Sequence, residues 1–195
     1  MRKENLLKLA EEIRRLAPNA IPIIVGSQAV HVITNFVPET VRQSIECDFL
    51  LTGDGKSEIR AAINKKLGVF SPFQIEHGFY ADALGLATVI LPTGWRERLQ
   101  TLEDENGNVI AYVAEIHDIA VSKLIAGREK DFLFLKEAFL REYISIDEFL
   151  ERSRLIRSMP QSEVLVSRLE NLVKFIPKSH ISAVRKMLAE LKSDS

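Results

Sequence analysis

The chain has 195 residues, of which 46% are hydrophobic and 27% are charged, and its formal net charge is −1 at pH 7. This near-neutral charge gives no electrostatic reason to expect general nucleic-acid binding. No apolar run approaches the ~20 residues that a membrane-spanning helix requires. The single cysteine, Cys47, cannot form an intramolecular disulfide. Together these features predict a soluble, cytoplasmic globular protein without a membrane partner.

The first 116 residues contain the pattern of a mixed sheet with helices. Apolar residues at a spacing of three and four predict helices, and short β-branched runs predict strands. Pro22 confines its strand to a sheet edge or lies among that strand's first residues. Turn signals stand at 52–55 and 105–108, the second of which joins two antiparallel strands. The expected elements are helices over 3–16, 28–34 and 56–67 and strands over 21–25, 45–51, 78–81, 87–91, 99–102 and 109–114.

Helices dominate the rest of the chain. No proline occurs over 117–143, so we expect one long helix there, with Gly127 inside it. Ser145 and Glu148 form a capping-box pattern that opens another helix. Two further helices are expected, one opening near Ser158 to Gln161 and one around Ile181 to Leu191. The predicted fold is α+β: a nucleotidyltransferase-like core over 1–116, its mixed sheet flanked by helices, and a C-terminal helical region over 117–195.

Two acidic residues stand two apart on the strand expected over 45–51. Because side chains alternate along a strand, Glu46 and Asp48 face the same side, where their oxygens could share a divalent cation. Mg²⁺ and Mn²⁺ favour such oxygen ligands. The plainer alternative is a solvent-facing side of a strand.

Gly26 and Ser27 follow the strand expected over 21–25 and precede a helix. A glycine lets the backbone approach a phosphate closely, serine adds a hydroxyl, and the helix start offers free N–H groups. The alternative is an ordinary tight turn. Combined with the acidic pair, the pattern predicts a nucleotide–metal site.

This order of elements resembles the Gly-Ser and Asp-x-Asp signature of the nucleotidyltransferase superfamily, with Glu46 in place of the first aspartate. The segments 91–99 and 117–131 are similar to those of an uncharacterised bacterial family of nucleotidyltransferase-like proteins, distantly similar to AbiEii-type toxins. The resemblance extends over roughly residues 20–157. It implies a third carboxylate on a neighbouring strand, for which Asp82 is the best-placed candidate, although a turn or cap role is the alternative.

A second group of candidate residues is basic. Arg128 and Asp131 are three apart within the helix expected over 117–143, so they can pair with each other. One interpretation is a buried ion pair that fixes the helix. The other is that Lys123, Arg128 or Lys130 approaches nucleotide phosphates.

Two functional hypotheses follow. The first is a Mg²⁺- or Mn²⁺-dependent nucleotidyltransferase that uses a nucleoside triphosphate and an unknown acceptor, which could be RNA, protein or a small molecule. In it Glu46 and Asp48 hold metal, Asp82 completes the catalytic set, and Gly26 and Ser27 hold the triphosphate. The second is a catalytically degenerate binding module with a protein partner, as in a toxin–antitoxin or phage-defence pair.

Overall fold

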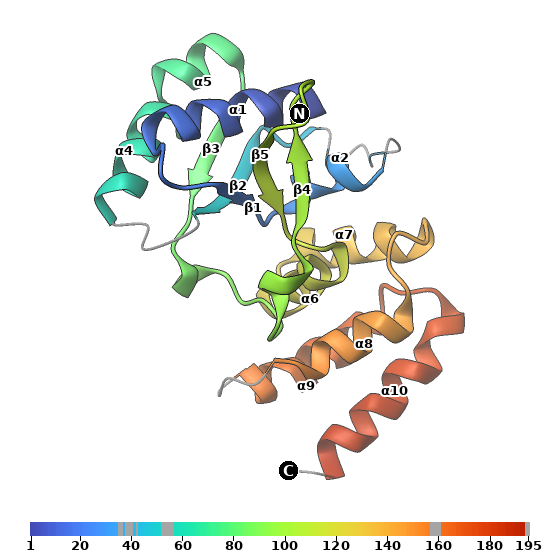
Figure 1. Cartoon of the computed structure of the whole chain (residues 1–195). Coiled ribbons are helices and arrows are strands. Elements are labelled where there is room, and N and C mark those ends of the chain that lie inside the picture. Colours follow the sequence, from blue (N-terminus) through green and yellow to red (C-terminus); the bar gives the residue numbers. More distant parts are fainter. Residues whose placement is uncertain (35–36, 38–40, 42, 52–56, 157–160, 194–195) are drawn as a thin grey trace. The chain divides into compact units, whose positions relative to one another are not determined.

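A computed structural model describes residues 1–34, 37, 41, 43–51, 57–156 and 161–193 (Figure 1). The expected turn at 52–55 and the residues Ser158 to Pro160 lie outside this described part. The chain divides into two units, Met1–Val89 with Arg96–Glu115, and Ile90–Trp95 with Ile116–Ser195.

The first unit is built on a five-stranded mixed sheet. Its strands are β1 (Pro22–Ile24), β2 (Glu46–Leu51), β3 (Tyr80–Ala83), β4 (Gln100–Glu103) and β5 (Val109–Val113), in the spatial order β3-β2-β1-β5-β4. β1 pairs antiparallel with β2 and parallel with β5, while β2 pairs parallel with β3. β4 and β5 form the expected antiparallel pair. Although β1 is central, its proline is tolerated because Pro22 is the first residue of the strand.

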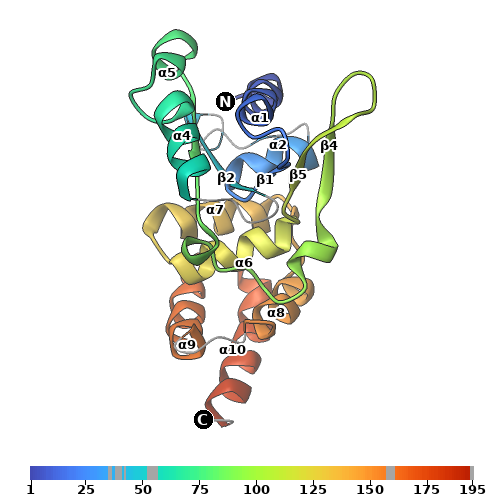
Figure 2. The same ribbon diagram turned by 60° about the vertical axis from the view of Figure 1, so that its left-hand side comes forward.

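Helices pack around this sheet. The helix α1 (Lys3–Leu16) contacts β1 and β5 through the buried residues Leu6, Leu9, Ala10 and Ile13. The helix α4 (Ser57–Leu67) contacts β3 and the short helix α5 (Pro72–His77) that follows it; Figure 2 shows α4 and α5 next to each other. Between β1 and β2 the described residues include the 3-10 turn η1 (Ser27–Ala29) and the short helix α2 (Val30–Ile33).

Two details of this unit differ from the sequence-based expectation. Residues 87–91 do not form a strand, because the chain leaves the sheet after β3 and makes a 3-10 turn, η2 (Leu86–Thr88), in which no residue is buried. The helix α5 was not predicted. It begins at Pro72, its N-cap Ser71 accepts a hydrogen bond from the Gln74 N–H, and Gly78 ends it with φ of 75°.

The second unit is helical and contains α6 (Ile116–Ala126), α7 (Glu129–Leu140), α8 (Ile146–Arg154), α9 (Gln161–Leu172) and α10 (Lys178–Ser193). Along the chain, the 3-10 turn η3 (Trp95–Arg98) contains the boundary between Trp95, which belongs to the second unit, and Arg96, which belongs to the first. At the start of α8, Ser145 accepts a hydrogen bond from the Glu148 N–H, as the capping pattern predicts. The prediction of a single long helix over 117–143 is wrong, because two helices, α6 and α7, occupy this range. Gly127 adopts a left-handed backbone with φ of 61°, which ends α6 and lets α7 start in a new direction.

The architecture confirms the predicted α+β class, with a mixed sheet and a C-terminal helical region. In the described ranges, no helix combines the length and the apolar character needed to cross a membrane.

Candidate functional site

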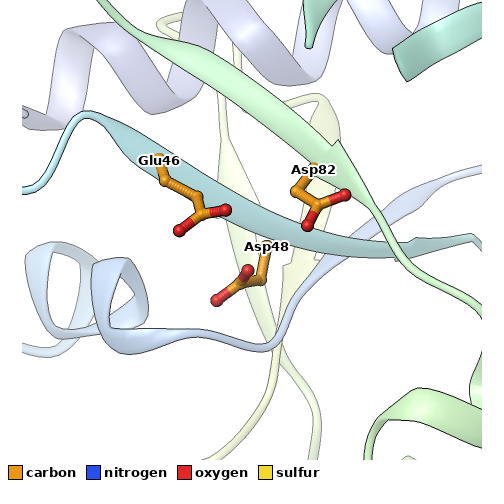
Figure 3. A group of neighbouring side chains, drawn as sticks. All are labelled: Glu46, Asp48 and Asp82. Carbon is orange, nitrogen blue, oxygen red and sulfur yellow. The ribbon is translucent and has the colours of Figure 1, made fainter. Parts of the chain in front are cut away.

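Three carboxylates meet on one face of the sheet. Glu46 and Asp48 lie on β2, and Asp82 lies on β3 directly opposite Asp48 in the parallel register. One oxygen from each of the three side chains lies within 4.8 Å of the other two. Figure 3 shows the three side chains projecting from the two strands toward one another.

Strand alternation produces this grouping. Cys47 lies between the two acidic residues of β2 and Phe49 follows them. Both are fully buried on the opposite face of the strand. The three carboxylates are each half-buried. The apolar face therefore fixes the register of β2, and that register leaves Glu46 and Asp48 together on the more open face. Cys47 is accordingly a core residue, and burial raises the pKa of its thiol, with a further contribution from the charges of Asp48 and Glu46.

Gly26 lies against the acidic cluster from the neighbouring strand. It follows β1, and a Cβ built on it would stand 2.1 Å from Asp48 Oδ2 and 2.9 Å from Asp48 Cγ. Any residue with a side chain would displace this carboxylate. The Val25 N–H donates to the Asp48 carbonyl oxygen at 3.1 Å, so the backbone of the turn is also tied to β2. Gly26 and Ser27 therefore occupy a strand-to-helix junction, as the sequence predicts, and Gly26 lies beside Asp48.

Negative charge accumulates at this site. Burial raises the pKa of Asp82, and the charge of Asp48 raises it further. These effects oppose the simultaneous ionisation of neighbouring carboxylates, and a bound cation would offset them. The donor set fits Mg²⁺ or Mn²⁺, because it consists of hard carboxylate oxygens close enough to reach one ion.

Tyr80 is a neighbour that the sequence did not reveal. It lies opposite Glu46 in the β2–β3 register. Desolvation raises the pKa of its hydroxyl, and the charge of Glu46 and a hydrogen bond to that carboxylate add to the effect. No local sequence signal links the two residues, because their register depends on how β3 pairs with β2.

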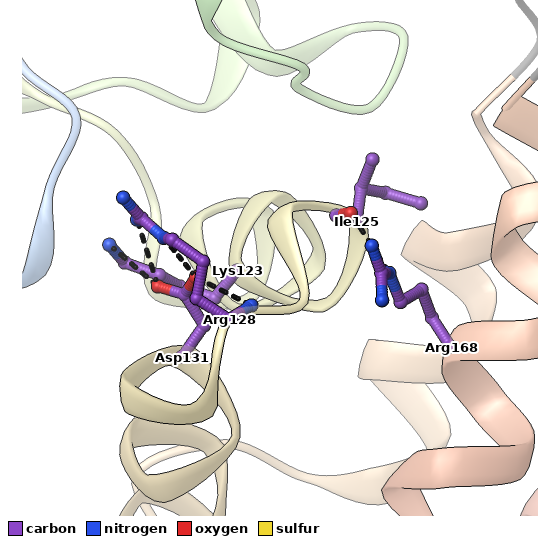
Figure 4. A network of polar contacts seen from close by, with 5 residues as sticks. All are labelled: Lys123, Ile125, Arg128, Asp131 and Arg168. Carbon is purple, nitrogen blue, oxygen red and sulfur yellow. Dashed lines mark hydrogen bonds and ion pairs between the residues drawn. The ribbon is translucent and has the colours of Figure 1, made fainter.

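The basic candidates belong to the second unit. Arg128 Nε donates to Asp131 Oδ2 at 2.7 Å and Arg128 Nη2 donates to Asp131 Oδ1 at 3.1 Å, while Lys123 Nζ lies 3.4 Å from Asp131 Oδ1 (Figure 4). The expectation that both members of the Arg128–Asp131 pair are buried is right for Asp131, at 1% exposure. It is wrong for Arg128, whose side chain is 57% exposed because it lies at the helix break. Lys130 is exposed. A role of Lys123, Arg128 and Lys130 in phosphate binding stays a prediction.

A mixed sheet that carries a Gly-Ser turn beside carboxylates on two adjacent strands matches the nucleotidyltransferase signature to which the sequence is similar. A family model described as nucleotidyltransferase of unknown function (DUF6036) matches residues 4–159. The chain belongs to this family. No curated protein and no solved structure matches the chain.

Proposed function

We propose that this protein transfers a nucleotidyl group from a nucleoside triphosphate to an acceptor in a Mg²⁺- or Mn²⁺-dependent reaction. The observation that carries the proposal is the convergence of Glu46, Asp48 and Asp82, with oxygens within 4.8 Å of one another. Family membership supports the nucleoside triphosphate as substrate. Transfer of this kind depends mainly on positioning and charge neutralisation, which such a site supplies.

Each residue of the site has a distinct part in this proposal. Glu46 and Asp48 hold the cation, which when bound neutralises charge on the phosphate oxygens. Gly26 has no side chain, so the Asp48 carboxylate can lie directly against the turn at which the phosphate would bind. Ser27, the next residue, offers a hydroxyl as a hydrogen-bond donor to a phosphate oxygen.

Asp82 is the proposed proton acceptor or third metal ligand. Burial and the charge of Asp48 raise its pKa, which makes its ionised form a stronger base. As a base it would take the proton from the acceptor hydroxyl, whose oxygen forms a bond to the α-phosphorus while the bond from this phosphorus to the bridging oxygen breaks and pyrophosphate leaves. The acceptor is a hydroxyl-bearing RNA, protein or small molecule.

The alternative is a degenerate module that binds a nucleotide or a protein partner, as in a toxin–antitoxin or phage-defence pair. Binding alone requires no third carboxylate. The place of Asp82 opposite Asp48 therefore supports the catalytic hypothesis.

The test is transfer of label from the four α-³²P ribonucleoside triphosphates with Mg²⁺ or Mn²⁺, using total RNA and total protein from the source cells as acceptors. Asp48→Asn and Asp82→Asn should abolish label transfer. Glu105→Gln, an exposed acid in the β4–β5 turn, is the control and should retain it. Absence of transfer to every acceptor class from wild-type protein would refute the proposal, as would equal transfer by Asp48→Asn.

A further inference from the structure

The turn between α4 and α5 places an aromatic residue in a backbone conformation that favours glycine. The Ser71 N–H donates to the Gly68 carbonyl oxygen at 3.1 Å, so Val69 and Phe70 are the central residues of this turn. Phe70 has φ of 61°. At that position of a turn a positive φ normally selects Gly or Asn, because a Cβ is strained there. The backbone alone gives no reason for a phenylalanine.

The side chain of Phe70 also contributes little to the core. It is 87% exposed, and the neighbouring apolar side chains Val69 and Ile75 are 53% and 80% exposed. Phe70 precedes the N-cap of α5 and Ile75 lies in its first turn, positions whose side chains often pack together. Here both remain open to solvent. These three residues, which we call the Phe70 patch, form an exposed apolar surface of the kind that marks interaction sites.

Charges of both signs border the Phe70 patch. Lys65 and Lys66 are exposed in the last turn of α4, and neither has an ion-pair partner among the described residues. Glu76 follows Ile75 on α5; its side chain is 74% exposed, and its Oε1 lies 3.7 Å from His77 Nε2. Along the chain, the Phe70 patch therefore has two exposed cations before it on α4 and an exposed carboxylate at its end on α5.

We propose that the Phe70 patch is a two-fold interface between two copies of this chain. In a two-fold interface each surface meets itself in reverse, so Lys65 and Lys66 would face the partner subunit's Glu76 while the apolar centres pack together. The net charge of −1 removes long-range repulsion between copies. The interface would bury the side chain that the strained turn holds in solvent, which explains why the turn carries phenylalanine.

The first test is Phe70→Gly, measured by sedimentation equilibrium over a wide range of protein concentration. Glycine relieves the positive φ, so the monomer should melt at a higher temperature while self-association weakens by about tenfold or more, as expected for loss of a central aromatic. Leu86→Ser is the matched control, because Leu86 is an exposed apolar residue elsewhere in the same unit and should leave association unchanged. A wild-type protein that is monomeric at every concentration overturns the proposal, and so does equal association of wild type and Phe70→Gly.

The second test uses charge reversal to show that the partner on the Phe70 patch is a second copy of this chain. Lys65→Glu, Lys66→Glu and Glu76→Lys should each weaken association by about threefold or more. Combining Glu76→Lys with either lysine reversal retains the net charge and re-creates opposite charges across a two-fold interface. At least one double variant should recover wild-type association. If neither double variant recovers wild-type association, the two-fold arrangement is overturned. None of these measurements depends on nucleotidyl transfer.

Discussion

Gly26 and Asp48 approach so closely that the candidate site depends on the absence of a side chain at residue 26. An added Cβ would stand 2.1 Å from Asp48 Oδ2. We expect Gly26→Ala to displace this carboxylate, to weaken Mn²⁺ binding and to cost about 1–3 kcal/mol of stability through overpacking. Gly85→Ala is the control, because its nearest atom would be Arg60 Nη2 at an ordinary 3.7 Å. Isothermal titration with Mn²⁺ and chemical denaturation measure the two effects, and unchanged Mn²⁺ affinity in Gly26→Ala would contradict this account.

Metal and nucleotide should stabilise the protein together. A ligand that binds only the native state adds about 2.7 kcal/mol at a hundredfold excess over its dissociation constant. We therefore expect Mg²⁺ with a nucleoside triphosphate to raise the melting temperature, and chelation of the metal to reverse the rise. Asp48→Asn should lose the metal-dependent part of this shift while the fold is retained. If no ribonucleoside triphosphate shifts the wild-type melting temperature with either metal, the metal assignment fails.

Asp82 should make stability depend on pH in the absence of metal. Its pKa is raised in the folded state by burial and by the charge of Asp48. Its favourable contribution is therefore complete below the unfolded pKa of about 3.9 and is lost as pH rises through the folded value. Asp82→Asn should be more stable than wild type at neutral pH, and the difference should shrink as pH falls toward 4. Urea denaturation across this pH range measures the difference; a constant gap would exclude Asp82 as its source.

Asp131 should matter more to stability than Arg128 does. Burial alone would raise the pKa of Asp131, but hydrogen bonds from Arg128 and the charges of Lys123 and Arg128 lower it below its ordinary value. Asp131→Ala leaves Lys123, whose side chain is only 14% exposed, without this partner and should cost about 3–5 kcal/mol.

Arg128→Ala should cost less, because Lys123 still pairs with Asp131. Since the folded pKa of Asp131 is lowered, its contribution is present above the unfolded pKa of about 3.9 and is lost as pH falls below it. Denaturation of both variants at pH 7 and at acidic pH tests this order, and equal costs at pH 7 would contradict it.

Gly127 should be required for the break between α6 and α7. Its φ is 61°, and an added Cβ would stand 2.2 Å from Arg168 Nε, which donates to the Ile125 carbonyl oxygen at 3.3 Å. Gly107 has a similar φ of 79°, but its Cβ would meet nothing within 4 Å. Gly107→Ala should therefore cost only the backbone strain of about 1–2 kcal/mol. Gly127→Ala should cost more, because Arg168 must also move, and equal melting temperatures of the two variants would exclude that contribution.

The sequence by itself determined the features that depend on local pattern. The spacing of Glu46 and Asp48 placed both on one face of a strand, because strand side chains alternate with a period of two. Gly26 and Ser27 marked the end of β1, and Ser145 marked the start of α8, because both positions follow local backbone and capping preferences. Apolar periodicity likewise identified α1, and the turn signal at 105–108 identified the antiparallel pair β4–β5.

Only the tertiary structure decided how distant segments meet. Asp82 could have capped a turn, but parallel pairing of β3 with β2 sets it opposite Asp48 and Tyr80 opposite Glu46. The closeness of Gly26 to Asp48 depends on the antiparallel pairing of β1 with β2, which no local preference encodes. The sequence did not reveal the helix break at Gly127, because apolar periodicity continues across it. The left-handed backbone of Gly127 and the position of Arg168 depend on how α6, α7 and α9 pack. The local sequence pattern therefore identified the candidate residues, whereas strand register and helix packing determined which of them lie together.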